Sequence, residues 1–306
     1  YLFNTGQADA IDNYDIFAPE AWKDTNSSPK ITVAVIDTGI DYNHFDLDDN
    51  IWFNSGEIKN NNIDDDGNGY IDDYQGWDFY YQDNDPMDFN NHGTHVAGII
   101  GAEGNNSIGI AGVSWDVQLM NLKVFSDYAT ERGAKNVYEA IYYAADNGAD
   151  VINLSLGTNL GVLTDYIYPS ITFEDFKQNA PNWYKGYYES LKYASDKGIT
   201  IIAALGNESD NTEIYSSIPA DFSTEIPGMI SVAALNNQGD LSYYSNYGNI
   251  TSIASPGGAQ YKENDPNGIL STVINNEYKY LQGTSMSAPM VAGSAALILE
   301  KDPTLT

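Results

Sequence analysis

The sequence predicts an α/β fold of three layers, in which a mainly parallel central sheet is covered by helices on both faces. Short apolar runs rich in β-branched residues are typical of buried parallel strands, and helical patterns alternate with them along the chain. This alternation favours a parallel sheet between two helical layers. The expected strands are Ile31–Ile36, Val117–Val124, Val151–Leu156, Ile199–Leu205 and Ile230–Leu235, and the expected helices are His92–Gly101, Val137–Asn147, Tyr187–Lys197 and Ser285–Lys301.

The composition is that of a packed globule. The chain has 306 residues, of which 42% are hydrophobic, and it shows no internal repeat and no linker that would divide it. This length suits one large α/β domain or two ordinary ones. No apolar run approaches bilayer length, so no membrane span is expected. The first residues lack a basic leader, so an exported protein would already have lost its signal segment.

Charge and cysteine content exclude several classes of protein and site. The chain has 43 acidic against 13 basic residues, a formal net charge of −30. Such a surface repels phosphate backbones, so nucleic acid is not expected as a partner, whereas divalent cations are attracted. Adaptation to a saline or cold habitat explains the charge equally well. The absence of cysteine excludes disulfides and thiol nucleophiles but leaves the compartment open.

The Asp-Thr-Gly at Asp37 admits three interpretations. It is the signature of aspartic proteases, in which two carboxylates share one proton. It also suits an ordinary strand that ends in a turn, or the acidic member of another catalytic set. An aspartic protease is built almost wholly from strands and needs a second such motif, and the chain contains none. Asp37 instead closes an apolar strand, at the edge where open α/β sheets place their sites.

Three further motifs carry polar side chains at element boundaries. The stretch NNHGTHVAG places His92 and His95 at the start of a helix, and GTSMSAPMVAG places Ser285 between a glycine turn and an apolar helix. A serine at a helix N-terminus lies beside free backbone N–H groups that stabilise an oxyanion. In AALGNES, the amide of Asn207 follows a strand and could donate as well. Each motif alone is more often a cap, a turn or a structural histidine.

Together and in this order, these residues resemble the subtilisin family of serine endopeptidases (subtilases, peptidase S8), from about Ala21 to Pro303. The resemblance implies a three-layer subtilisin-like fold. It also implies that Asp37 orients the base, His92 is general base and acid, Ser285 is the nucleophile and Asn207 donates to the oxyanion. His95 falls at the family's structural histidine.

The resemblance also indicates where a peptide would bind. Ser155, Leu156 and Gly157 match the strand end that lines the primary pocket in relatives, and Ser217 would lie near the pocket floor. A small uncharged floor favours bulky apolar side chains, although Ser217 is equally well read as an ordinary loop serine. Glu208 at the rim could still attract lysine or arginine.

Two calcium sites are expected. The stretch DDDGNGYIDD matches the first nine positions of an EF-hand loop, but Gln75 replaces the final glutamate and no helix pair flanks it. A calcium-binding surface loop is therefore favoured over an EF-hand, with a solvated acidic loop as the alternative. The expected ligands there are Asp64, Asp66, Asn68, Tyr70 and Asp72. By resemblance, a second calcium is held by Asp46, Gly104, Asn106, Ile108 and Ile110; HFDL, which contains Asp46, departs from the family at Phe45.

The function expected is thus a calcium-stabilised serine endopeptidase that acts through an acyl-enzyme. A processing protease of narrow specificity and a non-catalytic calcium-binding scaffold are the alternatives. Residues 1–306 are expected to form one peptidase domain whose C-terminal end is truncated, since relatives continue further. The resemblance implies a secreted or cell-surface monomer that binds a peptide or protein substrate and, before maturation, its own inhibitory propeptide.

One segment, Thr158–Gly186, is longer than relatives usually have and rich in aromatic residues. Long loops in compact domains are uncommon unless they are functional or disordered. Two interpretations stay open: a lid over a peripheral satellite core, or a wall of the substrate groove that narrows which peptides enter.

Overall fold

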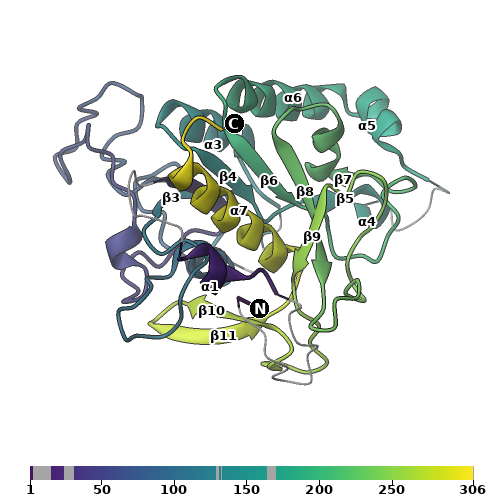
Figure 1. Cartoon of the computed structure of the whole chain (residues 1–306). Helices are drawn as coiled ribbons and strands as arrows, with labels where there is room; N and C mark the ends of the chain where they lie inside the picture. Colours follow the sequence, from purple (N-terminus) through teal and green to yellow (C-terminus); the bar gives the residue numbers. More distant parts are fainter. Residues whose placement is uncertain (3–14, 24–30, 129–130, 132, 164–169, 306) are drawn as a thin grey trace.

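The central layer is a seven-stranded sheet (Figure 1). The computed structural model describes residues 1–2, 15–23, 31–128, 131, 133–163 and 170–305. All strand pairs of the sheet are parallel. In spatial order the strands are β2 (Trp77–Asp78), β3 (Gln118–Lys123), β1 (Thr32–Asp37), β4 (Val151–Leu154), β6 (Thr200–Ala204), β8 (Met229–Leu235) and β9 (Ile253–Pro256). The predicted parallel sheet is confirmed.

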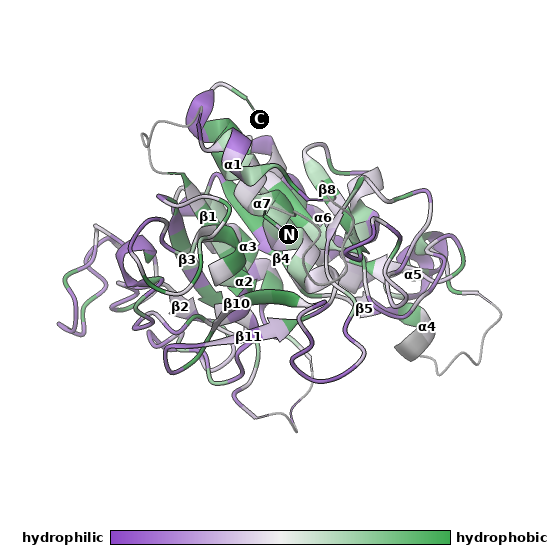
Figure 2. Ribbon diagram, turned by 60° about the horizontal axis from the view of Figure 1, so that its bottom comes forward, coloured by the Kyte–Doolittle hydropathy of each residue, from purple (hydrophilic) through white to green (hydrophobic). Residues whose placement is uncertain are grey.

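Helices cover both faces of this sheet, as predicted. Helices α2 (His92–Gly101) and α7 (Thr284–Lys301) pack on one face, and α3 (Val137–Asp146) and α6 (Pro181–Asp196) pack on the other. Successive side chains of a strand point to opposite faces of the sheet. Val33 and Val35 of β1 therefore belong to the hydrophobic cluster under α2 and α7, whereas Ala34 and Ile36 belong to the cluster under α3 and α6. Figure 2 shows hydrophobic segments gathered in these central elements and hydrophilic ones in the surrounding loops.

The strand order reverses at β1. The chain leaves β1 through α2 and enters β3 on one side, then returns through α3 to β4 on the other side of β1. Open α/β sheets bind ligands at the carboxyl ends of strands beside such a reversal. Asp37, the last residue of β1, therefore lies at the switch point of the sheet.

Several short elements were not predicted from the sequence. A hairpin of β10 and β11 packs against α2, and β5 pairs antiparallel with β7. Strands β2 and β9, at the two edges, are too short or too exposed to show a buried apolar run. The remaining bounds are α1 (Ala18–Ala21), η2 (Asp48–Asn50), β5 (Thr158–Asn159), α4 (Leu160–Leu163), α5 (Phe173–Asn179), β7 (Ser217–Ile218), η3 (Ala220–Thr224), β10 (Ile269–Val273) and β11 (Glu277–Leu281).

The aromatic segment 158–186 forms a packed unit in its second half. Helix α6 starts at Pro181, six residues before the predicted start, because proline is well suited to the first helical turn. The rings of Phe173, Phe176 and Tyr184 lie 5.1–6.4 Å from the buried ring of Phe222. These contacts support the satellite-core interpretation for α5 and α6. Tyr166 and Tyr168 lie outside the described residues.

In the part of the chain that the structure describes, no helix combines the length and apolar character needed to cross a bilayer.

Candidate active site

The carboxylate of Asp37 is joined to the imidazole of His92. Asp37 is fully buried at the end of β1, and its Oδ1 lies 2.7 Å from Nδ1 of His92, the first residue of α2. The backbone N–H of Thr38 donates to the same oxygen at 2.7 Å. Because a carboxylate oxygen accepts, Nδ1 carries the proton, and Nε2 is left as an acceptor when the ring is neutral.

A second buried carboxylate, Asp88, holds the start of α2. Its Oδ1 accepts from the Thr38 hydroxyl at 3.0 Å, and its Oδ2 accepts from the backbone N–H of Thr94 at 3.0 Å and from the Thr94 hydroxyl at 2.7 Å. The N-cap residue Asn91 has φ 90° and makes no side-chain cap. Asp88 thus satisfies a free N–H group of the first turn from outside the helix. The sequence analysis missed this residue, although an acid four positions before His92 was a usable sign of a cap.

These charges set the protonation of His92, whose side chain is 31% exposed. Burial lowers the pKa of His92, but the charge of Asp37, its hydrogen bond to the ring and the charge of Asp88 together outweigh burial. The pKa of His92 is therefore raised above its ordinary value of 6.5. A raised pKa makes the neutral imidazole a stronger base, which suits a general base.

Ser285 lies in the first turn of α7, and its Oγ donates to the backbone carbonyl of Ser155 at 3.2 Å. The side-chain oxygen of Asn207 accepts from the Thr284 N–H at 2.8 Å and from its hydroxyl at 3.1 Å. A Cβ at Gly283 would lie 3.5 Å from the Ser285 nitrogen, 3.6 Å from Oδ1 of Asn207 and 3.7 Å from Nδ2 of Asn207. The missing side chain at Gly283 therefore leaves open a space that two N–H groups border.

A single pocket is lined by three of the predicted catalytic residues and by all the predicted substrate-binding residues. It has a volume of about 310 Å³. Its walls include His92, Asn207 and Ser285, and the predicted substrate residues Ser155, Leu156, Gly157, Glu208 and Ser217 all line it as well. From the long aromatic segment, Thr158 and Asn159 line it too, so the segment begins in the pocket wall. Residues far apart in the chain thus meet at the carboxyl edge of the sheet.

The comparison with known families agrees with this geometry. A model of the subtilase family matches residues 28–306. This chain belongs to the subtilase family. It is 37% identical over 278 residues to a thermophilic serine proteinase of a Bacillus species (strain AK1). The aligned residues are 91% of this chain and 54% of that protein. To thermitase of Thermoactinomyces vulgaris it is 32% identical over 283 residues, covering 92% and 79%. The prediction of a subtilase, a family of serine endopeptidases, is confirmed.

Solved structures place this subtilase in the same fold. A structure of proteases from Pseudoalteromonas arctica superposes with a TM-score of 0.69 at 31% identity, covering 94% of this chain and 83% of that one. A cold-adapted subtilisin-like serine proteinase gives a TM-score of 0.61 at 25% identity, covering 90% and 79%. The subtilisin-like fold is confirmed. The chain spans about half the length of the first curated relatives that it matches, 54% and 45%.

The second histidine of this subtilase, His95, has a structural place. It is fully buried, and its Nε2 donates toward the carbonyl oxygens of Ile269 and Lys279 at 3.1 and 3.0 Å. These bonds attach the β10–β11 hairpin to α2. Burial lowers the pKa of His95 to about 3, so the ring stays neutral over the working pH range of most proteases.

The substrate pocket of this subtilase offers little free charge. Ser217 is 2% exposed and its hydroxyl donates to the carbonyl of Leu205 at 2.6 Å, so the hydroxyl is engaged by the backbone. Glu208 is half-buried, and one carboxylate oxygen accepts from the Asn207 N–H at 2.9 Å and from Asn246 Nδ2 at 2.7 Å. One oxygen of the Glu208 carboxylate, which the sequence suggested would be free at the pocket rim, is therefore held by hydrogen bonds within the protein. Asn246, 38 residues away, gave no signal in the sequence.

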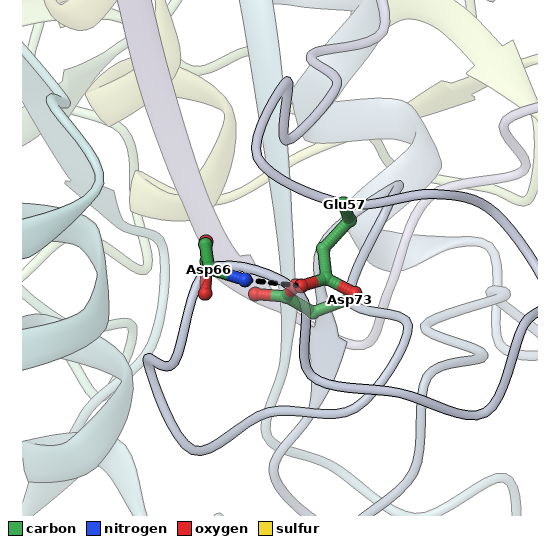
Figure 3. A group of neighbouring side chains, drawn as sticks. All are labelled: Glu57, Asp66 and Asp73. Atoms are coloured by element: carbon green, nitrogen blue, oxygen red, sulfur yellow. Dashed lines mark hydrogen bonds between the residues drawn. The ribbon is translucent and has the colours of Figure 1, made fainter.

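The acidic loop of this subtilase brings together a different set of carboxylates from the predicted one. One oxygen each from Glu57, Asp66 and Asp73 lie within 4.8 Å of one another. Figure 3 shows the Asp66 backbone N–H directed at Glu57, at 3.3 Å, with Asp73 beside them. No basic side chain pairs with these three among the described residues, so their mutual repulsion favours a cation.

Of the carboxylates predicted as ligands, Asp66 lies in this group, whereas Asp64 and Asp72 lie outside it. The carboxylate of Asp64 accepts backbone N–H bonds from Gly67 and Gly69, and that of Asp72 accepts from the N–H groups of Asn61 and Asn62. Glu57 accepts in the same way, from the N–H groups of Asp65, Asp66 and Asp72, so backbone hydrogen bonds alone do not separate ligands from carboxylates that shape the loop. Asn68 contacts the group through its Nδ2, and the N–H of Tyr70 donates to the Asn68 side chain. Glu57 precedes the stretch DDDGNGYIDD, and Asp73 is its last residue, after the nine positions that match an EF-hand loop. Counting EF-hand positions therefore does not include either residue.

Asp46, the carboxylate of the second predicted calcium site, is fully buried. Its Oδ1 accepts from Asn106 Nδ2 at 2.8 Å and its Oδ2 from the Ile110 N–H at 2.9 Å. Within the described residues, no basic side chain pairs with it, and no hydrogen bond occupies the carbonyls of Gly104, Ile108 or Ile110. A buried carboxylate that has no basic partner and contacts the Asn106 side chain is compatible with calcium, which prefers oxygen ligands.

Proposed function

We propose that this subtilase is a serine endopeptidase in which Asp37, His92 and Ser285 form a catalytic triad. The observation that carries the proposal is the pocket that His92, Ser285 and Asn207 share, with the buried Asp37 carboxylate behind the imidazole. A serine hydroxyl is a poor nucleophile until an imidazole takes its proton. No member of the set is replaced by an inert residue, which argues against a non-catalytic scaffold.

The residues would act in sequence on a peptide carbonyl. Nε2 of neutral His92 takes the Ser285 proton as Oγ attacks the carbonyl carbon, and Asp37 stabilises the imidazolium. The oxyanion that forms accepts from Asn207 Nδ2 and the Ser285 N–H, which border the open space beside Gly283. His92 then protonates the leaving amine, and the acyl-enzyme is hydrolysed by water activated in the same way.

The substrate we infer is an extended peptide with a bulky apolar side chain before the cut. The peptide would add as a strand beside Ser155–Gly157, a common mode of peptide recognition. Leu156 and Phe125 line the pocket, and the hydroxyl of Ser217 is bonded to the backbone. Glu208 is the only carboxylate lining this pocket among the described residues, and Asn246 restrains it, so a basic side chain finds a weaker partner there.

Labelling with a serine-directed phosphonate at several pH values tests this proposal. We expect a single adduct on Ser285, formed faster as His92 loses its proton. Because the pKa of His92 is raised, the midpoint of this rise lies above pH 6.5. The signal is the adduct mass and its rate of formation. An adduct elsewhere contradicts the assigned triad, whereas a rate midpoint at or below pH 6.5 contradicts only the raised pKa of His92.

Protonation of His92 does not unfold the protein, so unfolding through His92 does not explain slow labelling at low pH. A raised pKa means that the folded chain binds the proton more tightly than the unfolded chain. Protonation of His92 therefore adds stability that is present below pH 6.5 and is lost as the pH rises through the folded-state pKa. Tryptophan fluorescence recorded at each pH checks that the labelled protein is folded.

Calcium is the cofactor we propose for the two oxygen-lined sites. Bound calcium would neutralise clustered carboxylates and hold loops, without contact with the reacting atoms. A ligand that binds only the folded state stabilises it by about 4 kcal/mol at a thousandfold excess over Kd. In a large domain, each kcal/mol of stability changes the melting temperature by about 2 °C. We therefore expect EGTA to lower the melting temperature by roughly 8 °C, with a smaller effect on the initial activity at room temperature.

Two variants of the acidic loop distinguish the ligand sets. Glu57→Gln alters the three-carboxylate group, whereas Asp64→Asn alters a predicted ligand that lies outside it. We expect Glu57→Gln to remove part of the EGTA-dependent melting shift and Asp64→Asn to keep it. Equal melting temperatures with and without calcium in the parent protein would exclude both sites as stabilising elements.

The remaining inferences concern setting and partners. We infer that residues 1–306 act as one peptidase domain, as a monomer, outside the cell or on its surface. The surplus of carboxylates supports this setting, because weak acidic calcium sites are filled at extracellular calcium concentrations. An inhibitory propeptide would occupy the same strand-binding edge as a substrate. Mass measurement in solution and cleavage of unfolded casein at many sites, against none for a narrow processing enzyme, check these inferences.

A further inference from the structure

Helix α7 contains a proline, Pro289, four residues after Ser285. In a regular helix the carbonyl of residue i accepts from the N–H of residue i+4. Proline has no N–H, so the carbonyl oxygen of Ser285 lacks its regular i+4 partner in the helix. A buried carbonyl left without a donor is costly, and another group must supply one.

That donor is the side chain of Ser155, at the end of β4. Ser155 is 3% exposed, and its Oγ donates to the Ser285 carbonyl at 2.9 Å. Nδ2 of the fully buried Asn153 donates to the same Oγ at 2.9 Å. A hydroxyl has one proton, and a carbonyl only accepts, so the proton of Ser155 must point at Ser285 while Asn153 fills a lone pair of Oγ.

Ser155 therefore holds Ser285 from two directions. Its side chain binds the Ser285 carbonyl, and its own carbonyl accepts from the Ser285 hydroxyl at 3.2 Å. The same residue begins the pocket wall that receives the substrate backbone. The first turn of α7 is thus attached to the wall beside which the peptide must lie.

We propose that Asn153 and Ser155 are positioning residues for the nucleophile, and that Pro289 makes them necessary by removing the helical partner of the Ser285 carbonyl. This proposal builds on the assignment of Ser285 as nucleophile. The hydrogen bond between Ser155 and Ser285 fixes the peptide plane that follows the nucleophile, and with it the direction of Oγ relative to His92 and Asn207. Small misplacements of a reacting atom reduce turnover strongly while leaving binding intact.

A double-mutant cycle tests this arrangement. Ser155→Ala removes the hydroxyl but keeps the backbone carbonyl, and we expect kcat to fall about tenfold to a hundredfold, the cost of leaving a buried carbonyl unpaired, with little change in KM. Pro289→Ala restores an N–H that the Ser285 carbonyl can accept. In the Pro289→Ala background, we expect Ser155→Ala to lower kcat by less than about threefold, because the helix now supplies the partner.

Ser294→Ala is the matched control, since Ser294 is another serine of α7 whose hydroxyl bonds to a helix carbonyl, that of Met290. We expect its kcat to equal that of the parent. The rate of phosphonate labelling should follow kcat through the cycle, and thermal unfolding shows whether stability alone explains a loss. If Ser155→Ala does not fold, Asn153→Ala takes its place in the same cycle.

The outcomes separate this inference from the proposed function. If Ser155→Ala leaves kcat unchanged, or lowers it by the same factor with and without Pro289→Ala, the positioning role is overturned and the protein is still a serine protease. If the parent protein hydrolyses peptides and the Ser285→Ala variant does so equally well, the proposed triad itself fails. Partial recovery specific to the Pro289→Ala background supports the inference.

Discussion

Ser285→Ala is expected to abolish peptide hydrolysis, with kcat reduced by about a millionfold, a magnitude taken from the triad serine of subtilisin. The substitution removes the hydroxyl that we assign as the nucleophile, which lines the same pocket as His92 and Asn207. Asp37 and His92 stay paired, but without a nucleophile they have no proton to accept. Peptide turnover under saturating substrate measures the effect.

The fold should survive this change. The Ser285 side chain is half-buried at the pocket and donates a single hydrogen bond, to Ser155, so its loss leaves no cavity in the core. We expect the melting temperature of the variant to match the parent within a few degrees and phosphonate labelling to disappear. Turnover at the parental rate by a folded Ser285→Ala protein would show that another residue carries the chemistry.

Asn207→Ala is expected to lower kcat by about a hundred- to a thousandfold with little change in KM, again the scale known from the corresponding experiment in subtilisin. The reason is that Nδ2 would donate to the oxyanion, which exists in the transition state and not in the bound substrate. An interaction of this kind affects turnover rather than ground-state binding.

The matched variant is Asn207→Asp. Aspartate keeps an oxygen that can accept from the N–H and hydroxyl of Thr284, as Asn207 does at 2.8 and 3.1 Å, but it has no Nδ2 to donate. We therefore expect Asn207→Asp to be at least as slow as Asn207→Ala. If Asn207→Asp keeps the parental kcat, the role of Asn207 is to hold Thr284, and the oxyanion donor lies elsewhere.

Many features of the fold follow from local sequence. Strands such as 31–36 are apolar at all but one position because both of their faces are covered, and this signal needs no knowledge of the strands with which they pair. His92 and Ser285 were predictable for a similar reason: each opens a helix, so its short motif carries its own backbone geometry. The edge strands β2 and β9 escaped prediction because a short or half-exposed strand lacks that continuous apolar run.

The carboxylate sites show the opposite case. Counting positions in one loop predicted Asp64 and Asp72 as ligands, and both carboxylates accept backbone N–H bonds in the structure. The fold also brings Glu57 and Asp73 beside Asp66, a grouping that the count of positions does not contain. A carboxylate in a loop has many N–H donors within reach, and which of them it meets depends on how the loop packs on the sheet.

The sequence by itself therefore determined the order of the five central strands and four main helices, the family, and the identity of the candidate nucleophile, base and acid. Only the tertiary structure decided what holds these groups in place. Asp88 supports the start of α2, Asn246 restrains Glu208 across 38 residues, and Ser155 replaces the partner that Pro289 denies to Ser285 across 130 residues. Short motifs specify local backbone conformation, whereas hydrogen bonds between distant segments form only where sheet order and helix packing bring their ends together.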